Sequence, residues 1–230
     1  MRIYGGVYYN EDGLSTAVRG MSAQTKLFGI INDNILGYNK TGYQGKTAVT
    51  SSFAEVIGAN AISEVRDNQV GRLTKSEKPL DFALASEGFF QYLGPDGIKA
   101  TRDGRFQIDK EGYLLTLENQ KILSNSGEPI KFNKLPDTAE DVKLDSNGSI
   151  FVLNHQTKEL DPVATLGIVS DKGAIMKNPD VKQGFQEASN VMLQTEFMNL
   201  IPVRRSFAAN RQMFIMQNSL LSQAIQQLGR

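Results

Sequence analysis

Both ends of the chain carry a hydrophobic residue at every seventh position. Near the N-terminus this series consists of Leu14, Met21, Phe28 and Ile35. Near the C-terminus it consists of Leu193, Leu200, Phe207, Phe214, Leu221 and Leu228. Seven residues are close to two turns of an α-helix, so each series returns to one side of a helix and forms an apolar seam. Each seam needs a partner surface, and we predict that the two terminal helices pack together as a coiled-coil-like stem.

The C-terminal helix is predicted over residues 187–228, with one interruption. Pro202 lacks the N–H that would bond the carbonyl of Met198, which costs roughly 3 kcal/mol inside a helix. We therefore predict a kink or a break near residues 198–202. A second series on this helix mixes apolar and polar side chains, namely Phe197, Arg204, Arg211, Asn218 and Ile225, while Ile201, Ala208 and Ile215 flank the first seam. This asymmetry favours contacts with several neighbours over a simple two-stranded zipper.

The N-terminal helix is predicted over residues 13–36. Ser15 and Thr16 are the candidate N-caps, and the helix is expected to end near Gly37. The polar, glycine-containing segment 39–46 then forms a turn into extended structure.

Between the two ends, residues 70–175 are interrupted repeatedly by short turns that contain glycine. These turns are Pro95-Asp96-Gly97, Arg102-Asp103-Gly104, Lys110-Glu111-Gly112, Asn125-Ser126-Gly127 and Ser146-Asn147-Gly148. Asp-Gly and Asn-Gly pairs supply the positive φ that tight hairpins require, which predicts a meander of β-hairpins. The predicted fold class is α+β, with an N-terminal helix and turn in residues 1–50, a β-rich domain in 51–183 and a C-terminal helix in 184–230.

Residue types that serve common catalytic and metal sites are scarce. The chain has no cysteine, and its one histidine, His155, lies in a predicted strand end or loop without the pattern of a catalytic triad. The turn 145–148 lacks the glutamate that completes a calcium loop. Lys40 occupies the place of the first glycine in a phosphate-binding loop that would end at Gly45-Lys46-Thr47. We expect no enzyme activity, no cofactor, no metal and no small-molecule substrate.

Charge and hydropathy argue against two further classes of protein, those that bind nucleic acid and those that span a membrane. The formal net charge is zero, with about +2 in residues 1–50, −4 in 51–183 and +2 in 184–230. This is too mild for a nucleic-acid footprint and permits self-association. Arg204, Arg205 and Arg211 could bind phosphate or lipid headgroups, but pairing with acidic neighbours or solvation is favoured. No apolar stretch reaches the roughly 20 residues of a membrane span, and no Sec-type signal is visible.

Several short strings of the chain are specific in combination, although no single one is. Near the C-terminus they are Gly184, Glu187-Ala188-Ser189-Asn190-Val191, Glu196-Phe197-Met198-Asn199-Leu200-Ile201, Arg205-Ser206-Phe207 and Asn210. In the middle they are Gly71-Arg72-Leu73, Pro79-Leu80-Asp81-Phe82-Ala83-Leu84, Gly88-Phe89-Phe90 and Thr101-Arg102-Asp103-Gly104-Arg105-Phe106. Together these strings resemble one known family, the bacterial flagellar rod and hook axial proteins. In the N-terminal motif Asn34, Ile35, Asn39, Gly42 and Tyr43 fit, whereas Asp33, Leu36, Gly37, Lys40 and Gln44 depart from it.

The resemblance implies a structural subunit of the flagellar basal-body rod, either distal or proximal. It implies terminal helices that pack with those of other copies and of other rod or hook subunits into a tubular shaft that transmits torque. It also implies a place in the periplasmic rod, reached by type III export without a cleaved signal. The expected assembly interface comprises Leu14, Met21, Phe28, Ile35, Leu193, Phe197, Leu200, Phe207, Phe214, Leu221, Ile225 and Leu228.

Two alternatives stay open at this stage. A hook-type axial protein is less expected, because hook proteins of the family usually carry larger insertions in the middle of the chain. An extracytoplasmic carbohydrate-binding module would use Phe89, Phe90 and Tyr92 as exposed aromatic side chains, although aromatic residues in such strands more often fill a sheet core.

Overall fold

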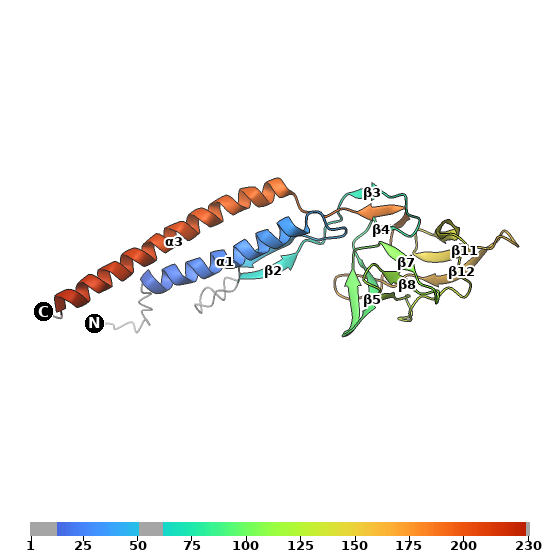
Figure 1. Ribbon diagram of the computed structural model, residues 1–230, viewed down its shortest axis with the longest axis horizontal. Coiled ribbons are helices and arrows are strands. Elements are labelled where there is room, and N and C mark those ends of the chain that lie inside the picture. The colour runs from blue at the N-terminus through green and yellow to red at the C-terminus, as the bar shows by residue number, and fades with distance from the viewer. Residues whose placement is uncertain (1–12, 51–61, 229–230) are drawn as a thin grey trace, which may run out of the picture. The chain divides into compact units, whose positions relative to one another are not determined.

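The structure is a computed structural model, and it describes residues 13–50 and 62–228 (Figure 1). The described chain divides into two compact units. We call them the helical unit, which contains residues 13–35, 46–50, 62–65 and 192–228, and the β unit, which contains residues 36–45 and 66–191. Helices, a strand-rich middle and the pairing of the terminal helices confirm the α+β fold class.

Two long helices dominate the helical unit. They are α1 (Gly13–Gly37) and α3 (Leu193–Leu228), and β1 (Lys46–Thr50) and β2 (Ile62–Arg66) form a two-stranded sheet. The range predicted for the first helix is confirmed, including its end at Gly37. Ser15 and Thr16, however, already lie within the helix, so the prediction that they act as N-caps is wrong. Among the described residues, no helix combines the length and apolar character that crossing a bilayer requires.

The C-terminal helix differs from its prediction in two ways. It passes through Pro202 without a break, and Figure 1 shows one continuous ribbon. A single proline removes one backbone hydrogen bond from a helix of 36 residues, which is a small part of what holds the helix together. The helix also begins at Leu193 rather than near residue 187, because Glu187 belongs to a β-strand.

The β unit consists of short antiparallel strands. They are β3 (Leu73–Lys75), β4 (Phe82–Leu84), β5 (Phe89–Gly94), β6 (Gly97–Thr101), β7 (Phe106–Ile108), β8 (Leu114–Thr116), β9 (Lys121–Ile122), β10 (Val142–Leu144), β11 (Ser149–Leu153), β12 (Leu160–Thr165), β13 (Ile168–Val169), β14 (Val181–Gln183) and β15 (Phe185–Glu187). A short 3₁₀ turn, η1 (Ala139–Asp141), precedes β10.

These strands form four sheets. The largest has six strands in the order β13-β5-β9-β8-β7, with β6 paired to β5, and a three-stranded sheet has the order β10-β11-β12. Two pairs complete the unit, β14 with β4 and β15 with β3. The last two pairs join strands that lie about a hundred residues apart, so the segment before α3 returns to the start of the β unit.

Glycine turns explain most of the predicted hairpins. Gly97, Gly112, Gly127 and Gly148 have φ values of 121°, 85°, 84° and 81°, which confirms the positive φ expected at these turns. Gly104 has a different reason to be glycine. A Cβ at this position would collide with the carbonyl oxygen of Phe82, so close backbone packing excludes a side chain.

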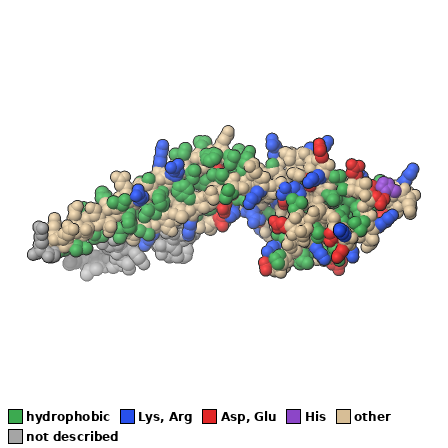
Figure 2. All heavy atoms as spheres, in the orientation of Figure 1, with side chains coloured by type: hydrophobic (Ala, Val, Ile, Leu, Met, Phe, Trp, Pro, Cys, Tyr) green, Lys and Arg blue, Asp and Glu red, His purple; other side chains and the backbone are tan. Residues whose placement is uncertain are grey.

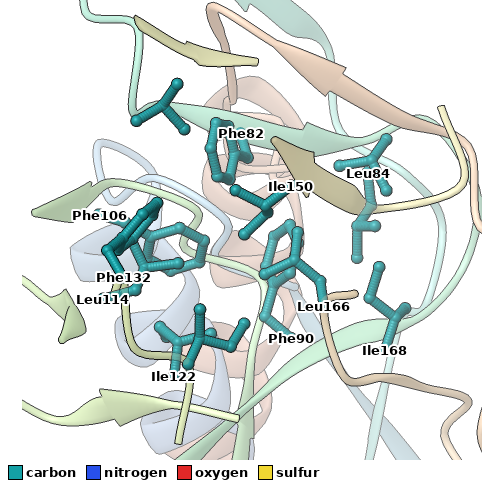
Figure 3. Packing of buried hydrophobic residues seen from close by; sticks show 13 residues of the cluster. Phe82, Leu84, Phe90, Phe106, Leu114, Ile122, Phe132, Ile150, Leu166 and Ile168 are labelled. Carbon is teal, nitrogen blue, oxygen red and sulfur yellow. The ribbon is translucent and has the colours of Figure 1, made fainter. Parts of the chain in front are cut away.

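The core of the β unit is a single cluster of buried aliphatic and aromatic side chains (Figure 3). Within it, Phe106 makes edge-to-face ring contacts to Phe82 at 5.7 Å and to Phe90 at 5.3 Å between centroids. Phe89 is also buried, and Tyr92 packs against the cluster. Phe89 and Phe90 are therefore buried rather than displayed for a carbohydrate, and Tyr92 is half-buried against the core.

Candidate assembly interface

The two terminal helices contact each other in antiparallel orientation. Phe28 of α1 meets Phe207 of α3 edge-to-face, with ring centroids 6.4 Å apart and an interplanar angle of 80°. Further toward the start of α1, the Nδ2 of Asn210 donates to the Oε1 of Gln24 at 3.0 Å. Gly13 lies against the amide of Gln217. Contacts therefore move toward the C-terminus of α3 as they move toward the N-terminus of α1.

The predicted seam residues separate into two groups. Eight are half-buried on this helical pair, namely Leu14, Met21, Phe28, Ile35, Leu193, Leu200, Phe207 and Phe214. The other four are exposed, with relative exposures of 52% for Phe197, 47% for Leu221, 70% for Ile225 and 88% for Leu228. Within the half-buried group, the ring contact between Phe28 and Phe207 joins α1 to α3 within one chain.

The sequence-based prediction missed a second series on α3. Ala17 and Ile31, which belong to the apolar pattern that predicts the first helix, are buried on α1, and half-buried side chains recur on α3 at Glu196, Val203, Asn210 and Gln217. These positions lie three residues from the first series, where a heptad places its other core position. The spacing could have identified them, but three of the four on α3 are polar.

Asn34 links three elements of the helical unit. Its Oδ1 accepts from the backbone N–H of Lys46 at 2.8 Å, and its Nδ2 donates to the Lys46 carbonyl at 2.8 Å and to the Oε1 of Glu196 at 3.0 Å. A buried amide that satisfies both its donor and its acceptor fixes α1 against β1 and the start of α3. Asn34 is among the residues that fit the N-terminal family motif.

The Lys46 side chain adds an ion-pair network beside this amide. Its Nζ lies 3.0 Å from the Oδ2 of Asp33 and 3.0 Å from the Oε2 of Glu64. The hydrogen bonds to Glu64 and then to Asp33 raise the pKa of Lys46 above its ordinary value. The ammonium group therefore stays charged and joins α1, β1 and β2.

In the β unit, a buried ion pair clamps the segment that leads toward α3. The side chains of Arg102 and Glu187 are only 1% and 2% exposed, and the guanidinium Nη2 lies 2.6 Å from the Oε2 of Glu187. The same guanidinium donates to the carbonyls of Leu84, Ser86 and Gly88 at 2.8–3.2 Å. The prediction named Arg102 as part of a turn and of a string that resembles the family, and no local signal in that turn indicates its burial.

A second contact of Glu187 and the side chain of Asn190 complete the clamp. The Oε1 of Glu187 accepts from the backbone N–H of Gly71 at 2.8 Å. Asn190 accepts from the Gly45 N–H at 2.7 Å through Oδ1, and its Nδ2 donates to the carbonyls of Asp67 and Gln69 at 3.0 Å each. Residues 187–190 are therefore held by polar contacts to several loops, which explains why the helical pattern does not start there.

His155 lies in the turn after β11, as predicted, and it has an acidic partner that sequence reasoning missed. Its Nε2 lies 2.9 Å from the Oδ1 of Asp141, fourteen residues away. The backbone N–H of Thr138, and then His155, hold the pKa of Asp141 below its ordinary value. A cavity of about 260 Å³ lies nearby, lined by residues 133–137, 152–155 and 161–163. Among the described residues, no group of three His, Asp or Glu side chains is placed to hold a metal ion.

Two family models match the chain. A model described as "Flagellar hook protein FlgE/F/G D1 domain" matches residues 83–152, within the β unit. A second, described as "Flagellar basal body rod FlgEFG protein C-terminal", matches residues 182–227, which include β15 and most of α3. The two matched segments together span about half of the chain.

Curated relatives cover nearly all of it. FlgF, a flagellar basal-body rod protein of Mesorhizobium japonicum, is 27% identical over 95% of this chain and 98% of its own length. FlgF of Rhizobium meliloti is also 27% identical, with the same coverage. FlgG of Bacillus subtilis is 25% identical over 92% of this chain and 97% of its own length.

The fold, the paired terminal helices and the two segments that match family models all indicate one class of protein. This class is the axial proteins of the bacterial flagellum. The chain belongs to the FlgE/F/G family and is a flagellar basal-body rod protein. It is accordingly a structural subunit of the rod, located in the flagellar basal body.

Proposed function

We propose that the helical unit joins this rod subunit to its neighbours through the part of α3 that α1 leaves uncovered. The observation that carries the proposal is the exposure of Phe197, Leu221, Ile225 and Leu228, which all belong to the predicted interface. Burying each such side chain contributes about 1.5–3 kcal/mol. Docking against other subunits would supply that burial.

In this proposal the neighbours are further copies of the chain and other rod or hook subunits. A head-to-tail contact that does not close on itself generates a helical array, which is the arrangement a tubular shaft requires. Of the predicted ends 1–50 and 184–230, residues 13–35, 46–50 and 192–228 of the helical unit then form the assembly core, and the β unit, residues 36–45 and 66–191, forms the β-rich domain. The shaft transmits torque in the periplasmic part of the basal body, with no catalytic step, cofactor, nucleic acid or small-molecule substrate.

Replacing two exposed seam residues tests this role. Leu221→Asp combined with Ile225→Asp places two charges on the uncovered surface, where burial against a neighbour would cost several kcal/mol. We expect the double variant to keep its far-UV circular dichroism and to lose the fibres or oligomers that the parent chain forms, as seen by electron microscopy and sedimentation.

The matched control adds the same charges at polar positions of the same helical turns. Asn218→Asp combined with Ser222→Asp should leave assembly largely intact, since both side chains are polar and exposed. Equal assembly of the parent chain and the Leu221/Ile225 variant would overturn the proposal.

A further inference from the structure

The outer side of α3 carries a second apolar stripe, distinct from the seam that faces α1. The stripe consists of Phe197, Ile201, Ala208 and Ile215. At about 100° per residue these positions span roughly 40° of the helix circumference, about a quarter turn from Leu200 and Phe207. All four are exposed. Figure 2 shows hydrophobic side chains along the visible face of the helical unit, with Lys and Arg side chains among them.

Arginines flank this stripe on both sides. On the same helical geometry, Arg204 and Arg211 lie between the stripe and the α1-facing seam, and Arg205 lies on the far side. All three side chains are exposed. Within residues 13–50 and 62–228, none of their guanidinium groups forms an ion pair.

Carboxylates that could balance these arginines are already committed in the described helices. Glu196 is the one acidic residue of α3, and it accepts from Asn34. Asp33 of α1 pairs with Lys46. Two copies that met stripe to stripe would therefore place arginines against arginines, and like charges across an interface disfavour the contact.

We propose that the stripe docks an amphipathic helix of a different rod subunit, one whose apolar seam is flanked by carboxylates. This assignment rests on the proposed function and adds the chemistry of the partner. Guanidinium groups bind carboxylates in bidentate geometry, so the flanking arginines select for an acidic partner helix and against pairing of this stripe with the same stripe of another copy. An anionic membrane is a poorer match, because juxtamembrane lipid recognition uses clusters of about four to eight cations.

A charge-reversed copy of the chain serves as the probe. Arg204→Glu, Arg205→Glu and Arg211→Glu together keep the apolar stripe and surround it with carboxylates. We expect a one-to-one mixture of the parent chain and this variant to associate at a concentration at least about tenfold lower than either alone, measured by sedimentation velocity. Raising the salt from 50 to 500 mM should weaken the effect, since exposed ion pairs are screened.

Three outcomes would overturn the assignment. One is a mixture that associates no better than the parent chain alone. Another is the same gain with Lys143→Glu, Lys172→Glu and Lys177→Glu, a control that makes the same charge change on exposed lysines of the β unit. The third is arginine-dependent binding of the parent chain to phosphatidylglycerol vesicles without any gain on mixing. If the triple variant loses helical signal, Arg211→Glu alone repeats the test.

Failure of this assignment differs from failure of the assembly role. If the Leu221/Ile225 variant assembles like the parent chain, the proposed function falls. If that variant is defective but mixing gives no gain, only the acidic partner is excluded.

Discussion

Arg102 and Glu187 show how much one buried contact can organise in the β unit. The pair joins positions 85 residues apart, and together the two side chains hold three backbone carbonyls and one N–H. Desolvating two charges is costly, so the intact pair need not add net stability. Removing only one partner is different, because it leaves the other charge buried and uncompensated.

We therefore expect Glu187→Ala to lower the free energy of unfolding by about 3–5 kcal/mol. Urea denaturation of the full chain, followed by near-UV circular dichroism, measures the change. The control is Lys99→Ala, which removes an exposed pair with Asp96 (3.1 Å) and should cost less than about 1 kcal/mol. Similar small losses for both variants would contradict the account.

The lowered pKa of Asp141 predicts that the stability of the fold depends on pH. Its pKa is lower in the folded chain than in the unfolded chain, so its ionised form stabilises the fold above about pH 4. That contribution is lost as the pH falls through the depressed pKa. Asp141→Asn should lower the thermal midpoint at pH 6, with a deficit that shrinks below pH 4.

The control for this titration is Asp137→Asn, an exposed carboxylate on the neighbouring loop. It should leave the thermal midpoint nearly unchanged at both pH values. A deficit for Asp141→Asn that stays constant from pH 6 to pH 2.5 would show that the carboxylate charge is not its cause.

At the scale of elements, periodicity and turn chemistry were sufficient for much of the fold. The heptad series identified α1 and α3, and glycines with positive φ identified hairpins such as β5–β6 and β10–β11. The start of α3 was not predictable in this way, because Glu187 and Asn190 are held by residues far away in the sequence. The burial of Arg102 was not predictable either, because its partner Glu187 lies 85 residues away in the sequence.

Pro202 should weaken α3 without breaking it. Pro202→Ala restores an N–H that can bond the Met198 carbonyl, and alanine is favoured over proline by up to about 3 kcal/mol in a helix interior. We expect a higher thermal midpoint of the far-UV helix signal. Gln212→Ala, at another exposed position of α3, should change it much less. A lower midpoint for Pro202→Ala would show that the proline itself supports the helix.

Phe28 and Phe207 should couple across the helical pair. Edge-to-face aromatic pairs contribute about 0.5–1.5 kcal/mol beyond their buried area. A double-mutant cycle with Phe28→Ala and Phe207→Ala should give a coupling energy of this size, measured by denaturant unfolding of the helix signal. A cycle between Phe28 and Phe214 provides the comparison and should give a smaller value. Equal coupling in both cycles would contradict specific pairing of the two rings.

At the scale of the whole molecule, the central claim is that exposed apolar side chains of α3 are covered by neighbouring subunits in the rod. The family was predictable from combined strings that span both units, and the comparisons confirm it. Which residues of the predicted assembly interface are half-buried and which are exposed was not predictable from the sequence. Helical periodicity shows that a side chain lies on a seam, but only the antiparallel contact with α1 shows which seam residues remain uncovered.

Site-specific photo-crosslinking in assembled basal bodies tests this claim most directly. The chain has no cysteine, so Ile225→Cys provides a single attachment point for a benzophenone maleimide. After irradiation, we expect adducts larger than the 25.4 kDa chain that join it to rod subunits, and none in the cysteine-free parent treated identically. Basal bodies that contain the labelled chain but yield only uncrosslinked monomer would contradict it.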